Sequence, residues 1–230
     1  QALALVNEEQ ARVREAHGPA SIFAGSYGWT SCGRFHHAQT LVKRWLNLAG
    51  GFTGHVDTYS YAAGPVILRH VLGGTDALTG RGTTLDAVAR HAGTVLIVGA
   101  LSARTAQIEA GGLARRSLPR NLEALRASGA RIVHVSPLAD DVPADLGAEW
   151  WPIRPGTDAA LLLGLAGEIV AGGREDADFL ARCTSGAELL LAHLRGEDDG
   201  QAKTAEWAAE ITGLDAGAIR ALARRFVETR

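Results

Sequence analysis

Apolar and polar positions follow two different patterns along the 230-residue chain. Over residues 93–100 (GTVLIVGA) and 130–137 (ARIVHVSP), apolar and β-branched residues run almost without interruption. Such runs are typical of strands buried on both faces of a parallel sheet. The intervening RRSLPRNLEALRASG has helical spacing and ends at Gly129. These segments predict a strand–helix–strand unit with a right-handed crossover, and therefore an α/β fold.

Helical spacing of apolar residues dominates the rest of the chain. ALALVNEEQARVREAHGP predicts a helix that ends at Gly18-Pro19, and ASIFAG (20–25) predicts a short strand. A second helix is expected over 35–48, and a short one begins near Pro65. EWWPIRPGTDAALLLGLAGEIVAGG predicts a short strand and then a helix capped near Thr157.

Amphipathic helices are expected over the C-terminal part of the chain, at 175–183, 186–195, 203–212 and 215–228. In the last of them Asp215 takes the N-cap position. One face of that helix is apolar and consists of Ile219, Leu222, Ala223 and Phe226.

Composition narrows the class of protein. The chain is 47% hydrophobic and 21% charged with a net charge of −2, which gives no electrostatic reason to expect nucleic acid or an anionic membrane as partner. No apolar run approaches the ~20 residues that span a bilayer. Cys32 and Cys183 lie too far apart for a cysteine-based metal motif, and a disulfide framework is not expected. The chain starts at Gln1 in mid-helix and contains no Met, so we expect a non-native N-terminus and infer nothing about targeting.

Ligands of open parallel sheets bind beyond the carboxyl ends of the strands. Here those ends are VGALSART (98–105) and HVSPLADD (134–141), which contain neither a full dinucleotide fingerprint nor a P-loop. Two interpretations of this edge therefore remain: it binds a nucleotide, or it belongs to a packed α/β domain without a nucleotide site. In RPGTDAALLLGLAG (154–167), Asp158 either caps its own helix or offers its carboxylate to the N–H groups of a guanine base.

Two further stretches contain candidate site residues. AGSYGWTSCG places Tyr27 and Trp29 on a loop of small residues, where the rings either plug the core or form the wall of a site. Taken alone, Ser60 in DTYSYAAG is best interpreted as a turn residue whose hydroxyl bonds nearby backbone. His36 and His37 point about 100° apart on a helix and would not share a metal ion. No hydrolase or zinc motif accompanies them.

Taken together, two long segments resemble the dimethyl sulfoxide reductase family of molybdenum enzymes, and within it the biotin sulfoxide reductases. They are GSYGWTSCGRFHHAQTLVKRWLNLAGGFTGH and residues 179–226, which include GEDDGQAKTAEWAAEI. The resemblance implies that residues 68–230 form a Rossmann-like αβα domain that binds molybdopterin guanine dinucleotide. It implies that residues 1–67 are part of an adjoining α/β active-site lobe, and that the chain is an internal portion of a longer enzyme.

The resemblance also implies roles for individual residues. Ser60 is the molybdenum ligand, although Thr58 and Tyr61 depart from the family's turn. The Tyr27 phenol hydrogen-bonds the substrate oxygen or the metal oxo oxygen, and the Trp29 indole N–H borders the same oxo group. A tyrosine at position 27 favours S-oxides. The cofactor-binding positions are Ser31, Gly99, Thr105, Ser136, Pro137, Thr157 and Asp158. Asp158 is the residue expected to bind guanine. Ser136 stands where the family has Asp, so this position lacks a carboxylate.

The implied cofactor is bis(molybdopterin guanine dinucleotide) molybdenum. The implied reaction is reduction of an S-oxide of the biotin, methionine or dimethyl sulfoxide type by oxygen-atom transfer, with N-oxides also considered. Its partners are that substrate, an electron donor that the sequence does not identify, and the rest of the same polypeptide. The alternative is a cofactor-free relative that serves as a structural or partner domain. We expect a cytoplasmic location, and a periplasmic one stays open.

Overall fold

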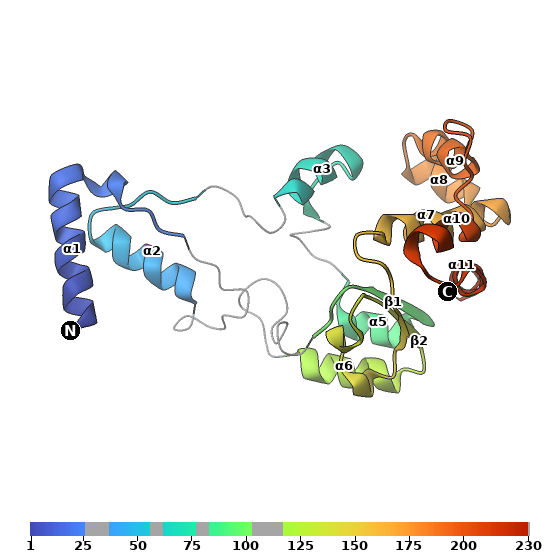
Figure 1. Ribbon diagram of the computed structural model, residues 1–230, viewed down its shortest axis with the longest axis horizontal. Helices are drawn as coiled ribbons and strands as arrows, with labels where there is room; N and C mark the ends of the chain where they lie inside the picture. Colours follow the sequence, from blue (N-terminus) through green and yellow to red (C-terminus); the bar gives the residue numbers. More distant parts are fainter. Residues whose placement is uncertain (26–36, 56–61, 77–82, 103–116, 230) are drawn as a thin grey trace. The chain divides into compact units, whose positions relative to one another are not determined.

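The computed structural model describes residues 1–25, 37–55, 62–76, 83–102 and 117–229 (Figure 1). The chain divides into two compact units. One unit comprises Gln1–Thr83 with Thr105–Leu118, and the other comprises Thr84–Arg104 with Pro119–Arg230. The boundary predicted between residues 67 and 68 stays a prediction.

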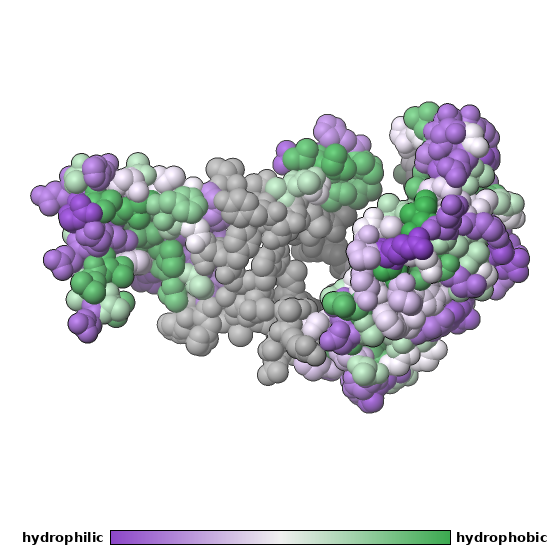
Figure 2. All heavy atoms as spheres, in the orientation of Figure 1, coloured by the Kyte–Doolittle hydropathy of each residue, from purple (hydrophilic) through white to green (hydrophobic). Residues whose placement is uncertain are grey.

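The first unit consists of helices and turns. Its elements are α1 (Ala2–His17), the 3-10 turn η1 (Pro19–Ser21), α2 (Ala38–Leu48) and α3 (Ala63–Val71). Several apolar side chains of α3 and its end are exposed, as the green surface of that helix in Figure 2 shows: Val66, Ile67, Val71 and Leu72.

The prediction of a strand over residues 20–25 is wrong. Residues 19–21 form a 3-10 turn in which the Ser21 hydroxyl donates to the Gly18 carbonyl at 2.7 Å. Phe23 then makes an isolated parallel bridge with Thr53. Pro19 at the start of the turn fixes its backbone in a turn conformation, which leaves too few extended residues for a ladder.

The second unit contains a parallel sheet, as the sequence predicted. Its first elements are α5 (Leu85–His91), β1 (Thr94–Val98), α6 (Leu118–Ala127), β2 (Arg131–Val135), the turns η2 (Ala139–Asp141) and η3 (Ala144–Leu146), and β3 (Glu149–Trp151). The strands lie in the order β1-β2-β3, and both pairings are parallel. The sequence pattern did not reveal α5, which the Thr84 hydroxyl caps by accepting from the Ala87 amide at 3.3 Å.

Five helices complete this unit: α7 (Asp158–Ala171), α8 (Ala177–Cys183), α9 (Ala187–Arg195), α10 (Ala205–Thr212) and α11 (Ala216–Glu228). The predicted cap of α11 is confirmed, because the Asp215 carboxylate accepts from the Ala218 amide at 2.7 Å. Its predicted apolar face is confirmed as well, since Ile219 and Leu222 are fully buried and Phe226 packs against the same core.

The hydrophobic core lies between one face of the sheet and helices α7, α10 and α11. Val133 and Val135 of β2 contribute to it and have no exposed surface. On the opposite face of β2, His134 is fully buried and Ile132 is 6% exposed, so the expectation of a strand buried on both faces is right for β2. It is wrong for β1, whose residues are half-buried and whose Val98 is 44% exposed. The physical reason is that β1 is an edge strand among the described residues, whereas β2 has a neighbour on each side.

Two glycines bring α7 close to α10 and to the backbone just before it. A methyl group on Gly167 would lie 1.9 Å from the Lys203 carbonyl oxygen, and one on Gly164 would lie 2.5 Å from the Ala208 Cβ. Only glycine allows this approach of the two backbones. The contact holds α7 in place, and α7 begins at Asp158.

Candidate functional site

Three loops leave the same edge of the sheet, because the strands are parallel. Gly99 follows β1, Ser136 and Pro137 follow β2, and residues 152–157 lead from β3 to α7. The structure therefore brings five predicted cofactor-binding residues to one edge: Gly99, Ser136, Pro137, Thr157 and Asp158. This is the edge at which open parallel sheets bind ligands.

The loop after β1 turns at Gly99, whose φ of +82° is a left-handed conformation that side chains disfavour. No atom of the described residues lies within 4 Å of where a Cβ would be, so among them conformation rather than space favours glycine there. The Gly99 amide donates to the Val135 carbonyl at 2.9 Å, and the Leu101 amide donates to the Asp141 carbonyl at 2.9 Å. These bonds fix the first loop against the second.

Ser136 is almost fully buried and bonded through every polar atom. Its hydroxyl donates to the Asp141 carboxylate and accepts from the Leu138 amide at 3.2 Å. Its carbonyl accepts from the Trp150 indole N–H at 2.8 Å, and its amide donates to the Trp151 carbonyl at 3.3 Å. Ser136 is therefore a rigid part of the edge, and its hydroxyl hydrogen is already donated to the Asp141 carboxylate.

The start of α7 leaves a carboxylate available. Thr157 is the N-cap residue, but its hydroxyl donates to the Arg154 carbonyl at 2.7 Å and makes no cap bond to the helix. Asp158 is half-buried, and its carboxylate accepts no hydrogen bond from the residues that the structure describes. The interpretation that Asp158 caps its own helix therefore finds no support in these contacts. A negative charge is favourable at this helix end because the helix dipole is positive there.

Arg154 anchors the loop before α7. Its Nη1 donates to the carbonyls of Glu210 at 2.6 Å and Ile211 at 3.2 Å, and its amide donates to the Thr212 carbonyl at 2.9 Å. One side chain thus satisfies carbonyls at the C-terminal end of α10 and holds the loop that leads to Asp158. Sequence reasoning missed this role; the available signal was an arginine just before the Pro-Gly-Thr-Asp turn.

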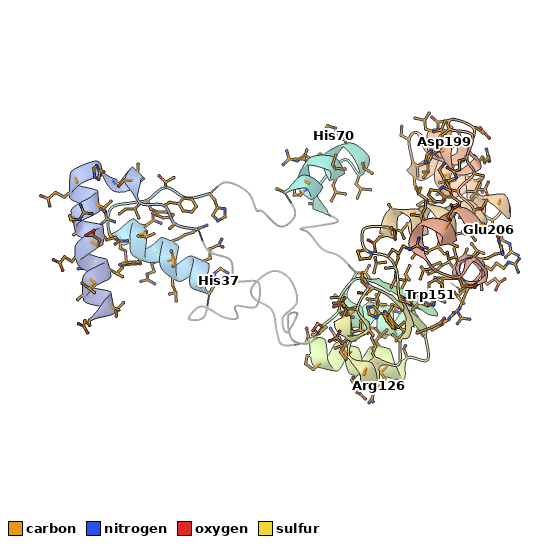
Figure 3. All side chains as sticks on the ribbon, in the orientation of Figure 1. His37, His70, Arg126, Trp151, Asp199 and Glu206 are labelled. Atoms are coloured by element: carbon orange, nitrogen blue, oxygen red, sulfur yellow. The ribbon has the colours of Figure 1, made fainter. Side chains whose placement is uncertain are left out.

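An ion pair joins the amino ends of β2 and β3, away from the site. Arg131 Nη2 lies 2.7 Å from Glu149 Oε2, and the Trp151 indole N–H donates to Glu149 Oε1 at 2.8 Å. The indole hydrogen bond is the main reason that the pKa of the Glu149 carboxyl lies below its ordinary value, and the hydrogen bond from Arg131 is the second reason. Trp151, labelled in Figure 3, ends the strand from which the chain passes to α7.

The other end of α7 carries a second ionic group. Glu168 accepts from the Ala205 amide at 2.8 Å and from Arg220 Nε at 3.2 Å, and Arg220 also pairs with Glu206 (labelled in Figure 3). The hydrogen bond from Arg220 lowers the pKa of the Glu206 carboxyl. These contacts join α7, α10 and α11 to one another.

His193, Asp198 and Asp199 form a group whose ligand atoms lie within 4.8 Å of one another. The Lys203 ammonium already donates to Asp199 Oδ2 at 2.5 Å, and this hydrogen bond lowers the pKa of the Asp199 carboxyl. The lysine therefore supplies the positive charge next to Asp199. We assign no metal to this group.

Tyr27, Trp29, Ser31, Ser60 and Thr105 lie outside the described residues. Their predicted roles stay predictions. Among the described helices, none is long and apolar enough to cross a membrane.

Comparison with known proteins places this arrangement in a family. The model of the molybdopterin oxidoreductase family matches residues 1–211, and the chain belongs to this family. The family implies a molybdenum–molybdopterin cofactor. A parallel-sheet unit whose loops leave one edge agrees with that membership.

Two individual members of the family are similar to the chain over its whole length. The chain is 64% identical over 229 residues to biotin sulfoxide reductase from Cereibacter sphaeroides, covering 100% of this chain and 31% of that protein. It is 40% identical over 230 residues to dimethyl sulfoxide/trimethylamine N-oxide reductase from the same organism, covering 100% of this chain and 28% of that protein. The chain thus spans less than a third of the length of these curated relatives.

A solved structure shares the fold. Acetylene hydratase from Pelobacter acetylenicus matches with a TM-score of 0.55 at 22% identity, covering 97% of this chain and 27% of that chain. At this identity the match concerns the fold alone. It supports the α/β architecture that the sequence predicted.

Proposed function

We propose that this chain is part of a molybdenum enzyme that reduces S-oxides by oxygen-atom transfer. In this proposal the cofactor is bis(molybdopterin guanine dinucleotide) molybdenum, and the second unit holds one of its two nucleotide tails. The 64% identity to a biotin sulfoxide reductase supports the substrate class. Biotin sulfoxide, methionine sulfoxide and dimethyl sulfoxide are the candidate substrates.

The observation that carries the proposal is the available carboxylate of Asp158 at the carboxyl edge of the sheet. Guanine presents a ring N–H and an exocyclic amino group side by side, and a carboxylate accepts both hydrogen bonds. Adenine lacks this pair of donors. Asp158 therefore selects guanine, and its position at the start of α7 fits a nucleotide lying across the strand ends.

The residues around Asp158 fit the same ligand. Arg154 and Thr157 hold the preceding loop through their bonds to α10 and to each other, so the carboxylate sits on a rigid support. Gly99 has a left-handed backbone, and no described atom lies within 4 Å of where a Cβ would be. A backbone without a side chain can approach a phosphate group closely.

The first unit supplies the reaction chemistry in this proposal. When bound, the molybdenum group provides the two-electron chemistry of oxygen-atom transfer. Ser60 would hold the metal through its side-chain oxygen. The Tyr27 hydroxyl donates to the sulfoxide oxygen, where negative charge develops, and one donor of this kind is worth roughly 3–4 kcal/mol in comparable sites. Trp29 borders the same oxygen.

Substitution of Asp158 in the full-length protein tests the proposal. Asp158→Asn keeps the shape of the side chain but points an amide N–H₂ at the guanine donors, so we expect less guanine per molybdenum, measured as GMP released by acid. Asp178→Asn is the matched control, because Asp178 is an exposed carboxylate in the first turn of α8. Unchanged guanine content in Asp158→Asn would remove Asp158 from the site. Wild-type protein without guanine or molybdenum would favour the cofactor-free alternative.

A further inference from the structure

Asp141 ends the short turn η2 after β2 and belongs to none of the predicted site residues. One of its carboxylate oxygens accepts the Ser136 hydroxyl hydrogen. Its carbonyl accepts from the Leu101 amide at 2.9 Å. Asp141 therefore bridges the loops that follow β1 and β2, and its carboxylate lies at the carboxyl edge of the sheet.

We propose that Asp141 binds the ribose of the guanine nucleotide, and that Ser136 is its positioning residue. This inference rests on the proposed function, because it assumes a nucleotide at this edge. A ribose joined through its 5′ position to a diphosphate presents two hydroxyl donors, at C2′ and C3′, and a carboxylate accepts from both. In doubly wound folds, an acidic residue near the end of the second strand commonly makes this contact.

The contacts of Ser136 explain why a serine stands at the strand end. Ser136 is 1% exposed and is fixed by Leu138, Trp150 and Trp151. Its hydroxyl has one hydrogen to donate, and it donates to Asp141. A carboxylate from five residues further along thus takes the position at the strand end, and Ser136 restricts it to one orientation.

The neighbouring carboxylate does not share these features. Asp140 is exposed, and its side chain makes no hydrogen bond within the described part of the chain. Asp141 is half-buried, and its Oδ1 accepts no hydrogen bond from a described residue, so this oxygen is available to the ribose. An oriented acceptor loses less conformational entropy on binding than a free one. Of the two adjacent carboxylates, Asp141 is therefore the nucleotide ligand, and Asp140 is its matched control.

Nucleotide binding to the cofactor-free form of the full-length protein tests this inference. The probes are GDP, 2′-deoxy-GDP and 3′-deoxy-GDP, measured by titration calorimetry. We expect Asp141→Asn to weaken GDP binding about 10- to 100-fold, the range of a charged hydrogen bond. We expect at least one deoxy analogue to bind the wild type more weakly than GDP and to lose less affinity than GDP does in Asp141→Asn. Asp140→Asn should bind GDP as the wild type does.

The possible outcomes separate this inference from the proposed function. If the wild type binds GDP, but Asp141→Asn binds it equally well, the ribose assignment is wrong and the nucleotide site stands. An equal loss for GDP and both deoxy analogues in Asp141→Asn also contradicts it, because the effect would not involve the ribose. If the wild type binds no GDP, the proposed function fails and this inference fails with it.

The role of Ser136 has its own readout. Ser136→Ala keeps the Asp141 carboxylate but removes its hydrogen bond, so we expect the preference for GDP over the deoxy analogues to shrink. The double variant Ser136→Asp/Asp141→Ser moves the carboxylate to the strand end and should restore that preference. A preference that Ser136→Ala leaves unchanged would show that Ser136 does not position Asp141.

Discussion

The guanidinium of Arg154 donates to the Glu210 carbonyl at 2.6 Å, although the two residues lie far apart in the sequence. Through this bond the end of α10 holds the loop that leads into α7 and to Asp158. We expect Arg154→Ala to lower the free energy of unfolding of this unit by about 1–3 kcal/mol, because the α10 carbonyls lose a charged donor. Hydrogen exchange should then accelerate at the amides of residues 156–160.

Arg224→Ala is the control for that experiment. Arg224 is an exposed arginine of α11 without a hydrogen bond or ion pair to any described residue. Its substitution should leave exchange at the start of α7 unchanged. Equal exchange in Arg154→Ala and the wild type would show that the loop does not depend on Arg154.

Gly167→Ala should be strongly destabilising. The added methyl group would lie 1.9 Å from the Lys203 carbonyl oxygen, which is backbone and cannot rotate away. Overpacking of this kind costs typically about 1–3 kcal/mol and sometimes more. Gly172→Ala serves as the comparison, because Gly172 has a right-handed helical backbone and its nearest neighbour would be 3.3 Å away. Chemical denaturation of both variants measures the difference, and equal stabilities would contradict the close approach of α7 and α10.

The Glu149 contacts predict a pH dependence of stability. The pKa of Glu149 is lowered in the folded state by the Trp151 indole N–H and by Arg131. Its contribution is therefore fully present above the unfolded pKa of about 4.3 and is lost as the pH falls through the folded value. Glu149→Gln should weaken this acid-dependent loss, as measured by thermal unfolding between neutral and acidic pH. An identical pH profile in the variant would contradict the prediction.

Tyr27→Phe in the full-length enzyme tests the predicted oxygen contact. Loss of one preorganised donor should slow S-oxide turnover about 100- to 1,000-fold. Molybdenum content should stay the same, because the proposed metal ligand is Ser60 and not Tyr27. Unaltered turnover would count against this role, and loss of molybdenum would indicate a structural one.

The sequence predicted the elements whose pattern depends on local spacing. Apolar runs revealed β1 and β2, and the residues at the N-cap positions, Thr157 and Asp215, marked the starts of α7 and α11. The strand expected near Phe23 failed, because an apolar run cannot show whether a partner strand continues beside it. The half-exposure of β1 was missed for the same reason, since the position of a strand in its sheet is a property of the tertiary fold.

The candidate site was predictable in part. Gly99, Ser136 and Asp158 could be placed at one edge because parallel strands end on the same side. The contacts of Arg154 with α10 and of Ser136 with Asp141 could not, because each depends on where a side chain lies in space. The absence of the family's aspartate at position 136 suggested a lost carboxylate. The structure instead brings the Asp141 carboxylate to that serine.

Measuring the guanine and molybdenum content of the full-length wild-type protein, purified from a host that makes the cofactor, tests whether it holds the proposed guanine dinucleotides. We expect two GMP released per molybdenum, one of them bound at the edge that carries Asp158. Purified protein that contains molybdenum but releases no GMP would contradict this expectation.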